Sequence, residues 1–151
     1  NSYWNETYRV GFVYPGRYAL VQGGIRPSLD VLFAVSLHDK AAYQSDGSKK
    51  VEETSLPGIY LEVFRNPKRY SLKEWMEETE YSYFDRDLGV FTTTHVAGRD
   101  AVSYAWSGSY PAQSVVFSED NRIYVLTLAA PTQETFFYQD FERIMNRIML
   151  E

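Results

Sequence analysis

The stretch that most constrains the fold runs from Val96 to Pro131, where segments rich in strand-forming residues alternate with short turns. Residues 102–106 alternate between bulky and small side chains, as expected for a half-buried strand with one bulky face. The segments 113–118 and 122–129 are rich in Val, Ile, Tyr and Phe, which favour strands. Consecutive strands joined by short turns must pair antiparallel, so this stretch predicts an antiparallel meander.

Clusters of turn-forming residues divide this meander. Glu119-Asp120-Asn121 separates the last two predicted strands, because Asp and Asn tolerate the left-handed backbone conformation. Gly98-Arg99-Asp100 predicts another tight turn, preceded by a strand at 91–96. Pro131 has no N–H to donate to a strand ladder, so the last strand is expected to end there.

The first part of the chain predicts further strands. Segments 8–14 and 18–21, joined by a Pro-Gly turn, predict an opening hairpin. The nearly continuous apolar run at 31–37 predicts a strand that is covered on both faces. The polar segment 38–57 predicts mostly a long surface loop, and a strand is expected to follow at 59–64.

Two helices are predicted. The first spans 71–84, where Ser71 can cap the helix and Glu74, three residues later, completes a capping box. The second begins near Thr132 as its cap and carries an apolar stripe from Phe137 to Ile148. Both helices therefore have one face that must pack against a sheet.

The expected order is four strands, a helix, four strands and a helix. Helices that cover a mostly antiparallel sheet make an α+β domain. The two helices can lie on opposite faces, as an αβα sandwich, or on the same face; the apolar run at 31–37 favours a sheet covered on both sides. A length of 151 residues suits one core, so a single domain is predicted to span residues 1–151.

Composition argues against several functions. The net charge is −5 and no basic run is longer than Lys49-Lys50, so no nucleic-acid partner is expected. Without cysteine, the chain has no thiolate nucleophile, disulfide or cysteine metal site. No apolar run approaches the roughly 20 residues that span a bilayer. Because the chain starts at Asn1 rather than Met, we expect a removed upstream signal or lipid anchor as its one link to a membrane.

Few residues point to chemistry. His38 and His95 each lie near a strand end, and with carboxylates they could bind zinc or manganese, but no HxH or HxxxH spacing is present. Ser107-Gly108-Ser109 does not match a nucleophile elbow, and Gly23-Gly24 does not match a phosphate loop. We therefore assign no catalytic residue, no metal ligand and no cofactor, and do not expect an enzyme.

Acidic residues gather around the first predicted helix, and aromatic residues follow them directly. Such carboxylates attract Ca²⁺ or a basic partner, or simply form a solvated helix face. Aromatic side chains dominate binding hot spots, so an exposed group here predicts a protein-binding patch. The residues assigned to this patch are Glu74, Glu77, Glu78, Tyr81, Tyr83 and Phe84. The loop from Ala41 to Pro57 is a second candidate contact surface.

Five hydrophobic and turn motifs follow one another along nearly the whole chain. They are Tyr8-x-Val10-x-Phe12-x-Tyr14-Pro15, Ser71-Leu72-x-Glu74-Trp75, Val96-Ala97-Gly98-Arg99-Asp100-Ala101, Ile123-Tyr124-Val125-Leu126-Thr127 before Ala130-Pro131, and Phe141-x-x-Ile144-Met145. In this order they resemble the PsbP/Mog1-like superfamily. The resemblance implies a central antiparallel sheet between helices and a typically non-enzymatic protein. In that superfamily, plant and cyanobacterial members assist photosystem II, Mog1 members bind a small GTPase, and many bacterial members are lipoproteins.

This acidic chain lacks the basic segments expected of a photosystem-docking member. We therefore expect a non-catalytic, extracytoplasmic protein-binding or assembly module, in the cell envelope or secreted, such as the soluble domain of a lipoprotein. The alternative is a small-ligand or metal-binding protein of the cell envelope with a pocket near His38 or His95. A binding module predicts an exposed aromatic patch, whereas a ligand binder predicts a concave site with converging polar groups.

Overall fold

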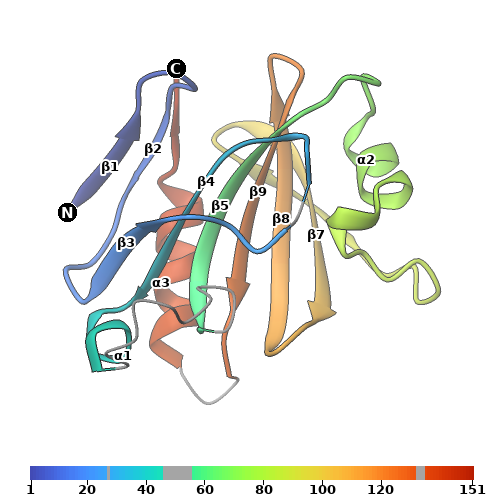
Figure 1. Ribbon diagram of the computed structural model, residues 1–151. Coiled ribbons are helices and arrows are strands. Elements are labelled where there is room, and N and C mark those ends of the chain that lie inside the picture. The colour runs from blue at the N-terminus through green and yellow to red at the C-terminus, as the bar shows by residue number, and fades with distance from the viewer. Residues whose placement is uncertain (27, 46–55, 132–134) are drawn as a thin grey trace.

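The computed structural model describes residues 1–26, 28–45, 56–131 and 135–151, and its main element is a seven-stranded antiparallel sheet (Figure 1). From edge to edge the strands are β3 (Tyr18–Gln22), β4 (Val31–Asp39), β5 (Gly58–Arg65), β9 (Arg122–Ala129), β8 (Pro111–Glu119), β7 (Arg99–Ser107) and β6 (Thr92–Val96). A smaller sheet, in the order β1-β2-β10, contains β1 (Ser2–Asn5), β2 (Val10–Val13) and β10 (Met149–Leu150).

Strands β6 to β9 form the predicted meander. Asp120 and Asn121 both adopt positive φ, 50° and 59°, as expected for a two-residue hairpin turn with a primed geometry. The β6–β7 turn has the same character, with φ of 51° at Ala97 and 77° at Gly98. The turn predicted at 98–100 was thus placed too far along the chain, because Arg99 already pairs with Val96 as the first residue of β7.

The predicted hairpin between segments 8–14 and 18–21 is wrong. β2 pairs with β1 and β10 in the small sheet, whereas β3 pairs with β4 in the large sheet. The Pro15-Gly16 segment therefore connects two sheets instead of closing a hairpin. The sequence identified both strands, although β2 starts at Val10 rather than Tyr8, but a period of two residues carries no information about which strand is the partner.

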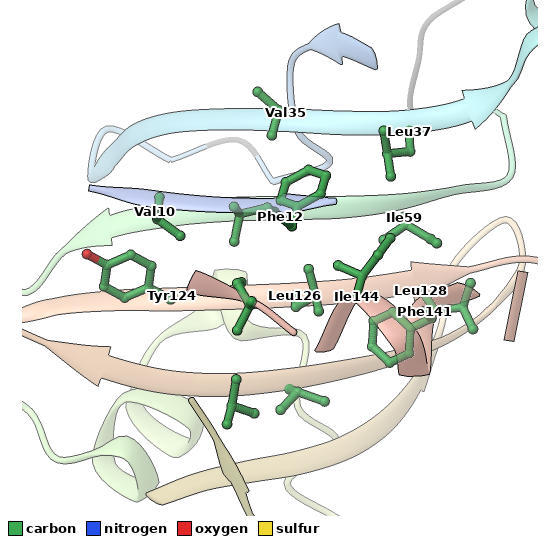
Figure 2. Packing of buried hydrophobic residues seen from close by; sticks show 14 of the residues in the cluster. Val10, Phe12, Val35, Leu37, Ile59, Tyr124, Leu126, Leu128, Phe141 and Ile144 are labelled. Carbon is green, nitrogen blue, oxygen red and sulfur yellow. The ribbon is translucent and has the colours of Figure 1, made fainter. Parts of the chain in front are cut away.

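One face of the large sheet packs against α3 (Thr135–Asn146) and the small sheet. Figure 2 shows Val10 and Phe12 of β2 in the same layer as Leu126 of β9 and Phe141 and Ile144 of α3. All five side chains are at most 2% exposed. The small sheet thus completes this core beside α3. The predicted cap of this helix, Thr132, lies outside the described residues.

The opposite face packs against α2 (Leu72–Glu78), so the fold is an αβα sandwich, one of the two arrangements that the sequence allowed (Figure 1). Trp75 and Met76 of α2 join Phe64 of β5 and Val125 of β9 in a second core. Alternate residues of β5 and β9 serve the two cores, which explains why their sequences are apolar on both faces.

The first predicted helix is shorter than expected. Its capping box is present, with the Ser71 hydroxyl accepting from the Glu74 N–H and the Glu74 carboxylate accepting from the Ser71 N–H. However, α2 ends at Glu78, and a short 3-10 helix, η2 (Glu80–Ser82), leads to Tyr83 in the left-handed conformation, with φ of 61°.

The predicted loop after His38 begins differently. β4 extends to Asp39 and is followed by a short helix, α1 (Lys40–Ser45). Residues 46–55, which make up half of the predicted loop and most of the predicted contact surface, lie outside the described residues. Within the described ranges, no helix combines the length and the apolar character needed to cross a bilayer.

Candidate functional site

A fully buried ion pair forms the base of the candidate site. Arg26 Nε lies 2.8 Å from Glu62 Oε1, and both side chains are 0% exposed. The other carboxylate oxygen of Glu62 accepts the backbone N–H groups of Ile25 and Arg26, each at 3.2 Å. The charge of Glu62, which lies in the middle of the buried strand β5, is thereby compensated on both oxygens.

Arg26 also joins the 3-10 helix η2 to the sheet. Its Nη1 donates to the carbonyl oxygens of Tyr81 and Ser82, at 2.9 and 2.7 Å. Its Nη2 donates to Ser114 Oγ of β8 and Thr127 Oγ1 of β9, at 2.9 and 2.8 Å. Together with the Glu62 contact, these bonds use all five N–H groups of the guanidinium. Arg26 therefore helps to fix the position of η2 on the sheet, together with the Tyr104 hydroxyl of β7, which donates to the Ser82 carbonyl oxygen at 2.6 Å.

Two aromatic rings flank this guanidinium. The centroids of Tyr83 and Trp106 lie 5.0 and 5.5 Å from Arg26 Cζ, within the range of cation–π attraction. The two rings are 4.7 Å apart, and the Trp106 indole nitrogen donates to Ser114 Oγ at 2.9 Å. Both rings are thus held in place by groups behind them, and both line an open groove.

This groove has a volume of about 850 Å³ and lies between the segment that follows η2 and the β7–β8 hairpin. Its apolar and aromatic lining includes Ile25, Tyr83, Leu88, Trp106, Tyr110 and Pro111. Leu88 is 72% exposed. We call this groove the aromatic groove.

The groove offers binding area more than reactive groups. Burial raises the pKa of Tyr83, although the charge of Arg26 partly opposes this shift. Burial likewise raises the pKa of Tyr104, beneath the groove, to about 12. Both phenols therefore stay protonated near neutral pH. The Asp85 carboxylate at the rim accepts the backbone N–H groups of Asp87 and Leu88, so it stabilises its own turn.

The structure separates the three aromatic residues that the sequence analysis assigned to a binding patch. Phe84 is only 6% exposed and packs in the core, so its side chain is not available to a partner. Tyr81 stacks on Phe64 at 5.3 Å and donates its hydroxyl to Asp30, and burial raises its pKa to about 12. Tyr83 and Phe84 both line the aromatic groove, but because Phe84 is nearly buried, Tyr83 is the one of the three that offers an accessible ring there. The expectation of one continuous exposed aromatic group is therefore corrected.

The predicted carboxylates do lie together at the surface around α2 and η2. With two further aspartates they form what we call the acidic cluster: Glu74, Glu77, Glu78, Glu80, Asp85 and Asp87. None of the six forms an ion pair with another residue that the structure describes. The nearby Arg86 instead donates to the backbone carbonyls of Glu77 and Thr79. The negative charge of the cluster is therefore left for solvent or a partner.

Several residues of the aromatic groove were not identified from the sequence. Trp106 was expected only as part of an alternating strand, and Leu88 carried no local signal. The buried Arg26–Glu62 pair did have a sequence signal. Glu62 interrupts an otherwise apolar strand, and a charge there requires a partner. Nothing in the local sequence identifies Arg26 as that partner.

The two histidines do not form a common site. His38 is 1% exposed; Pro57 O can only accept, so His38 Nδ1 donates to it at 2.9 Å, and Nε2 accepts from the Ser36 hydroxyl at 2.9 Å. Both ring nitrogens are thus engaged. His95 is exposed and lies 3.1 Å from Asp100. In the part of the chain that the structure describes, no three His, Asp or Glu residues are grouped as metal ligands.

The sequence matches no protein-family model and no curated protein sequence. Two solved structures are similar to the fold. The solution structure of cyanobacterial PsbP (CyanoP) from Synechocystis sp. PCC 6803 has a TM-score of 0.62 at 13% identity, over 100% of this chain and 92% of that chain. A crystal structure from Bacteroides thetaiotaomicron has a TM-score of 0.56 at 8% identity, over 99% of this chain and 48% of that chain. At these identities the similarity establishes the architecture: the chain has a PsbP-like fold.

Proposed function

We propose that the protein is a non-catalytic binding or assembly module that recognises another protein through the aromatic groove. The observation that carries this proposal is the combination of an open, largely apolar groove with the acidic cluster beside it. Exposed aromatic and aliphatic side chains supply contact area, and aromatic residues are typical binding hot spots. Because the Arg26 network fixes Tyr83 and Trp106 from behind, little side-chain freedom is lost on binding.

The same surface indicates the chemistry of the partner. A complementary segment has an apolar or aromatic side chain for the groove and Lys or Arg residues for the acidic cluster. Charges at the rim of an interface act mainly on the association rate and on partner choice. Binding should therefore weaken as the ionic strength rises, since exposed charges are screened over about 8–10 Å at physiological salt.

We further propose an extracytoplasmic location, as the globular domain of a lipoprotein in the cell envelope. This part of the proposal rests on the resemblance of the sequence motifs to bacterial members of the PsbP/Mog1-like superfamily. The similarity to cyanobacterial PsbP supports the fold on which that resemblance depends.

Site-specific photocrosslinking in the cell envelope of the source organism tests the binding proposal. A photoreactive residue replaces Leu88 in one protein and Leu29 in the matched control, because Leu29 is 93% exposed and does not line the groove. We expect a specific adduct from position 88 whose crosslinked segment is basic, and no such adduct from position 29. Neutralising the rim with Asp85→Asn and Asp87→Asn should lower the yield of the adduct.

The Kd of the complex is then measured with the purified partner and the purified domain. Leu88→Asp should raise the Kd at least tenfold and Leu29→Asp less than twofold, with unchanged thermal unfolding of both variants. Equal adducts from positions 29 and 88, or an adduct that is insensitive to salt and to the neutralised aspartates, would contradict the proposed surface.

A further inference from the structure

A second cavity, separate from the aromatic groove, lies on the same face of the sheet. It has a volume of about 290 Å³ and lies between the turn that follows β5 and the α2–η2 segment. The lining residues used in this argument are Lys68, Tyr70, Trp75, Glu78, Glu80 and Tyr81. A cavity of this size is at the lower limit for small-molecule sites, so any ligand must be small.

The wall of the cavity includes a buried donor without an acceptor. Trp75 is 1% exposed, and among the described side chains its indole Nε1 is the buried polar atom that lacks a hydrogen-bond partner. Buried donors in native proteins are almost always paired, with protein groups, ordered water or a ligand. Trp75 also lines the cavity, so an acceptor bound there is a candidate partner for this N–H.

Other polar groups in the wall are already engaged within the protein. The Asn66 side chain bonds to both the N–H and the C=O of Tyr70. Arg65 donates to the carbonyl of Leu29 and lies 3.4 Å from Asp30. The Asn66 side chain is thus engaged within the protein, and the charge of Arg65 is compensated by Asp30.

Charges of both signs remain at the cavity. Lys68, whose Nζ lies 6.0 Å from the Tyr70 ring, forms no ion pair with a described carboxylate. Glu78 and Glu80 are exposed members of the acidic cluster and likewise form none within the described ranges. A ligand that satisfies all these groups must therefore carry an anionic acceptor and a cation.

We propose that this cavity binds a small zwitterion of the free α-amino acid class. The ligand carboxylate accepts from the Trp75 N–H and pairs with Lys68, and the ligand ammonium group pairs with Glu78 and Glu80. An aliphatic side chain packs against the Tyr70 and Tyr81 rings. The linings of this cavity and of the aromatic groove are separate. Glu78 and Glu80 belong both to this site and to the acidic cluster, so the Trp75 resonance, rather than these carboxylates, distinguishes this site from the proposed protein-binding surface.

The test follows the Trp75 indole resonance in ¹H–¹⁵N NMR spectra, assigned with Trp75→Phe. Three probes share one side chain and differ in charge: L-leucine, L-leucinamide and N-acetyl-L-leucine. We expect L-leucine to move this resonance downfield in a saturable way, as the N–H gains an acceptor. The amide lacks the carboxylate and the acetyl form lacks the ammonium group, so each should bind at least tenfold more weakly.

Surface variants separate the site from a general effect on the core. Glu78→Gln combined with Glu80→Gln should raise the Kd for L-leucine at least fivefold. Asp87→Asn, which removes a carboxylate outside the cavity, should change it less than twofold. No saturable movement of the Trp75 resonance, or equal movement with all three probes, would overturn the proposal. Both results would leave the crosslinking test of the aromatic groove unaffected.

Discussion

Arg26 and Glu62 form an ion pair 2.8 Å apart in which neither side chain has any exposed surface. The pair lies between the 3-10 helix η2 and strands β5, β8 and β9. All five N–H groups of the Arg26 guanidinium donate hydrogen bonds to these elements. Buried ion pairs contribute little net stability over apolar replacements, but removing one partner leaves an uncompensated charge. The pair therefore helps to fix the position of η2 and, through Tyr83, the shape of the aromatic groove.

Arg26→Met should destabilise the protein by about 3–5 kcal/mol, because Glu62 is then buried without a counter-charge. Urea denaturation measures this loss as a lower free energy of unfolding. The double variant Arg26→Met/Glu62→Leu serves as the control and should recover much of the loss, since both charges are then removed. If the double variant is as unstable as Arg26→Met alone, the charge is not the cause.

Tyr18→Phe should destabilise the protein by about 1–3 kcal/mol, because it leaves a buried carboxylate oxygen without its donor. The Tyr18 hydroxyl donates to Asp140 Oδ2 at 2.7 Å, and each residue is 1% exposed. Chemical denaturation gives the difference from wild type. Tyr43→Phe, at a residue that is 38% exposed, is the matched control and should change stability by less than about 0.5 kcal/mol.

Lowering the pH should reduce the stability of the protein through protonation of His38. Burial lowers the pKa of His38 below its ordinary value of 6.5, although the hydrogen bond to Pro57 partly opposes this. As the pH falls below 6.5, the unfolded chain therefore takes up a proton before the folded protein does, and the free energy of unfolding decreases.

Denaturation at pH 7.5 and at lower pH values measures this dependence. His38→Gln should flatten the decline that starts near pH 6.5, and His95→Gln, at the exposed histidine, is the matched control. The assignment to His38 fails if wild type and His38→Gln lose stability in parallel over this range.

Gly58→Ala should destabilise the protein by about 1–3 kcal/mol through overpacking. A Cβ at this position would lie 2.8 Å from both His38 Nδ1 and the backbone oxygen of Leu37. Gly16→Ala is the matched control, since nothing lies within 4 Å of its added Cβ. Thermal unfolding of the two variants compares them directly; similar midpoints would show that β5 can move away from His38.

The sequence predicted the parts of the fold that depend on local chemistry. Asp120-Asn121 gave the β8–β9 turn, because both residues tolerate positive φ, and Ser71 with Glu74 gave the start of α2. Strand alternation and the apolar run of β4 gave a sheet that is covered on both faces. Each of these features is specified within a few neighbouring residues.

Features that depend on distant residues were not predictable in the same way. β2 was identified as a strand, but its partners, β1 and β10, come from the two ends of the chain. Phe84 and Tyr83 are adjacent in sequence, yet Phe84 is buried and the Tyr83 ring stays accessible in the groove, because Tyr83 adopts the left-handed conformation after η2. The groove itself combines segments around residues 25, 83–88 and 105–112, which no local pattern connects.

The small sheet has a consequence for the order of folding during synthesis. β10 pairs with β2, and the adjoining Arg9–Glu151 ion pair joins residues 142 positions apart. Val10 and Phe12 of β2, from the start of the chain, pack in the same core as α3, near its end. The meander can assemble while the chain is still emerging from a ribosome or a translocation channel, but this core is sealed only after Met149 and Leu150 have been released. Until then the apolar side of β2 is open to chaperones and proteases, so its protection from cleavage reports completion of the whole domain.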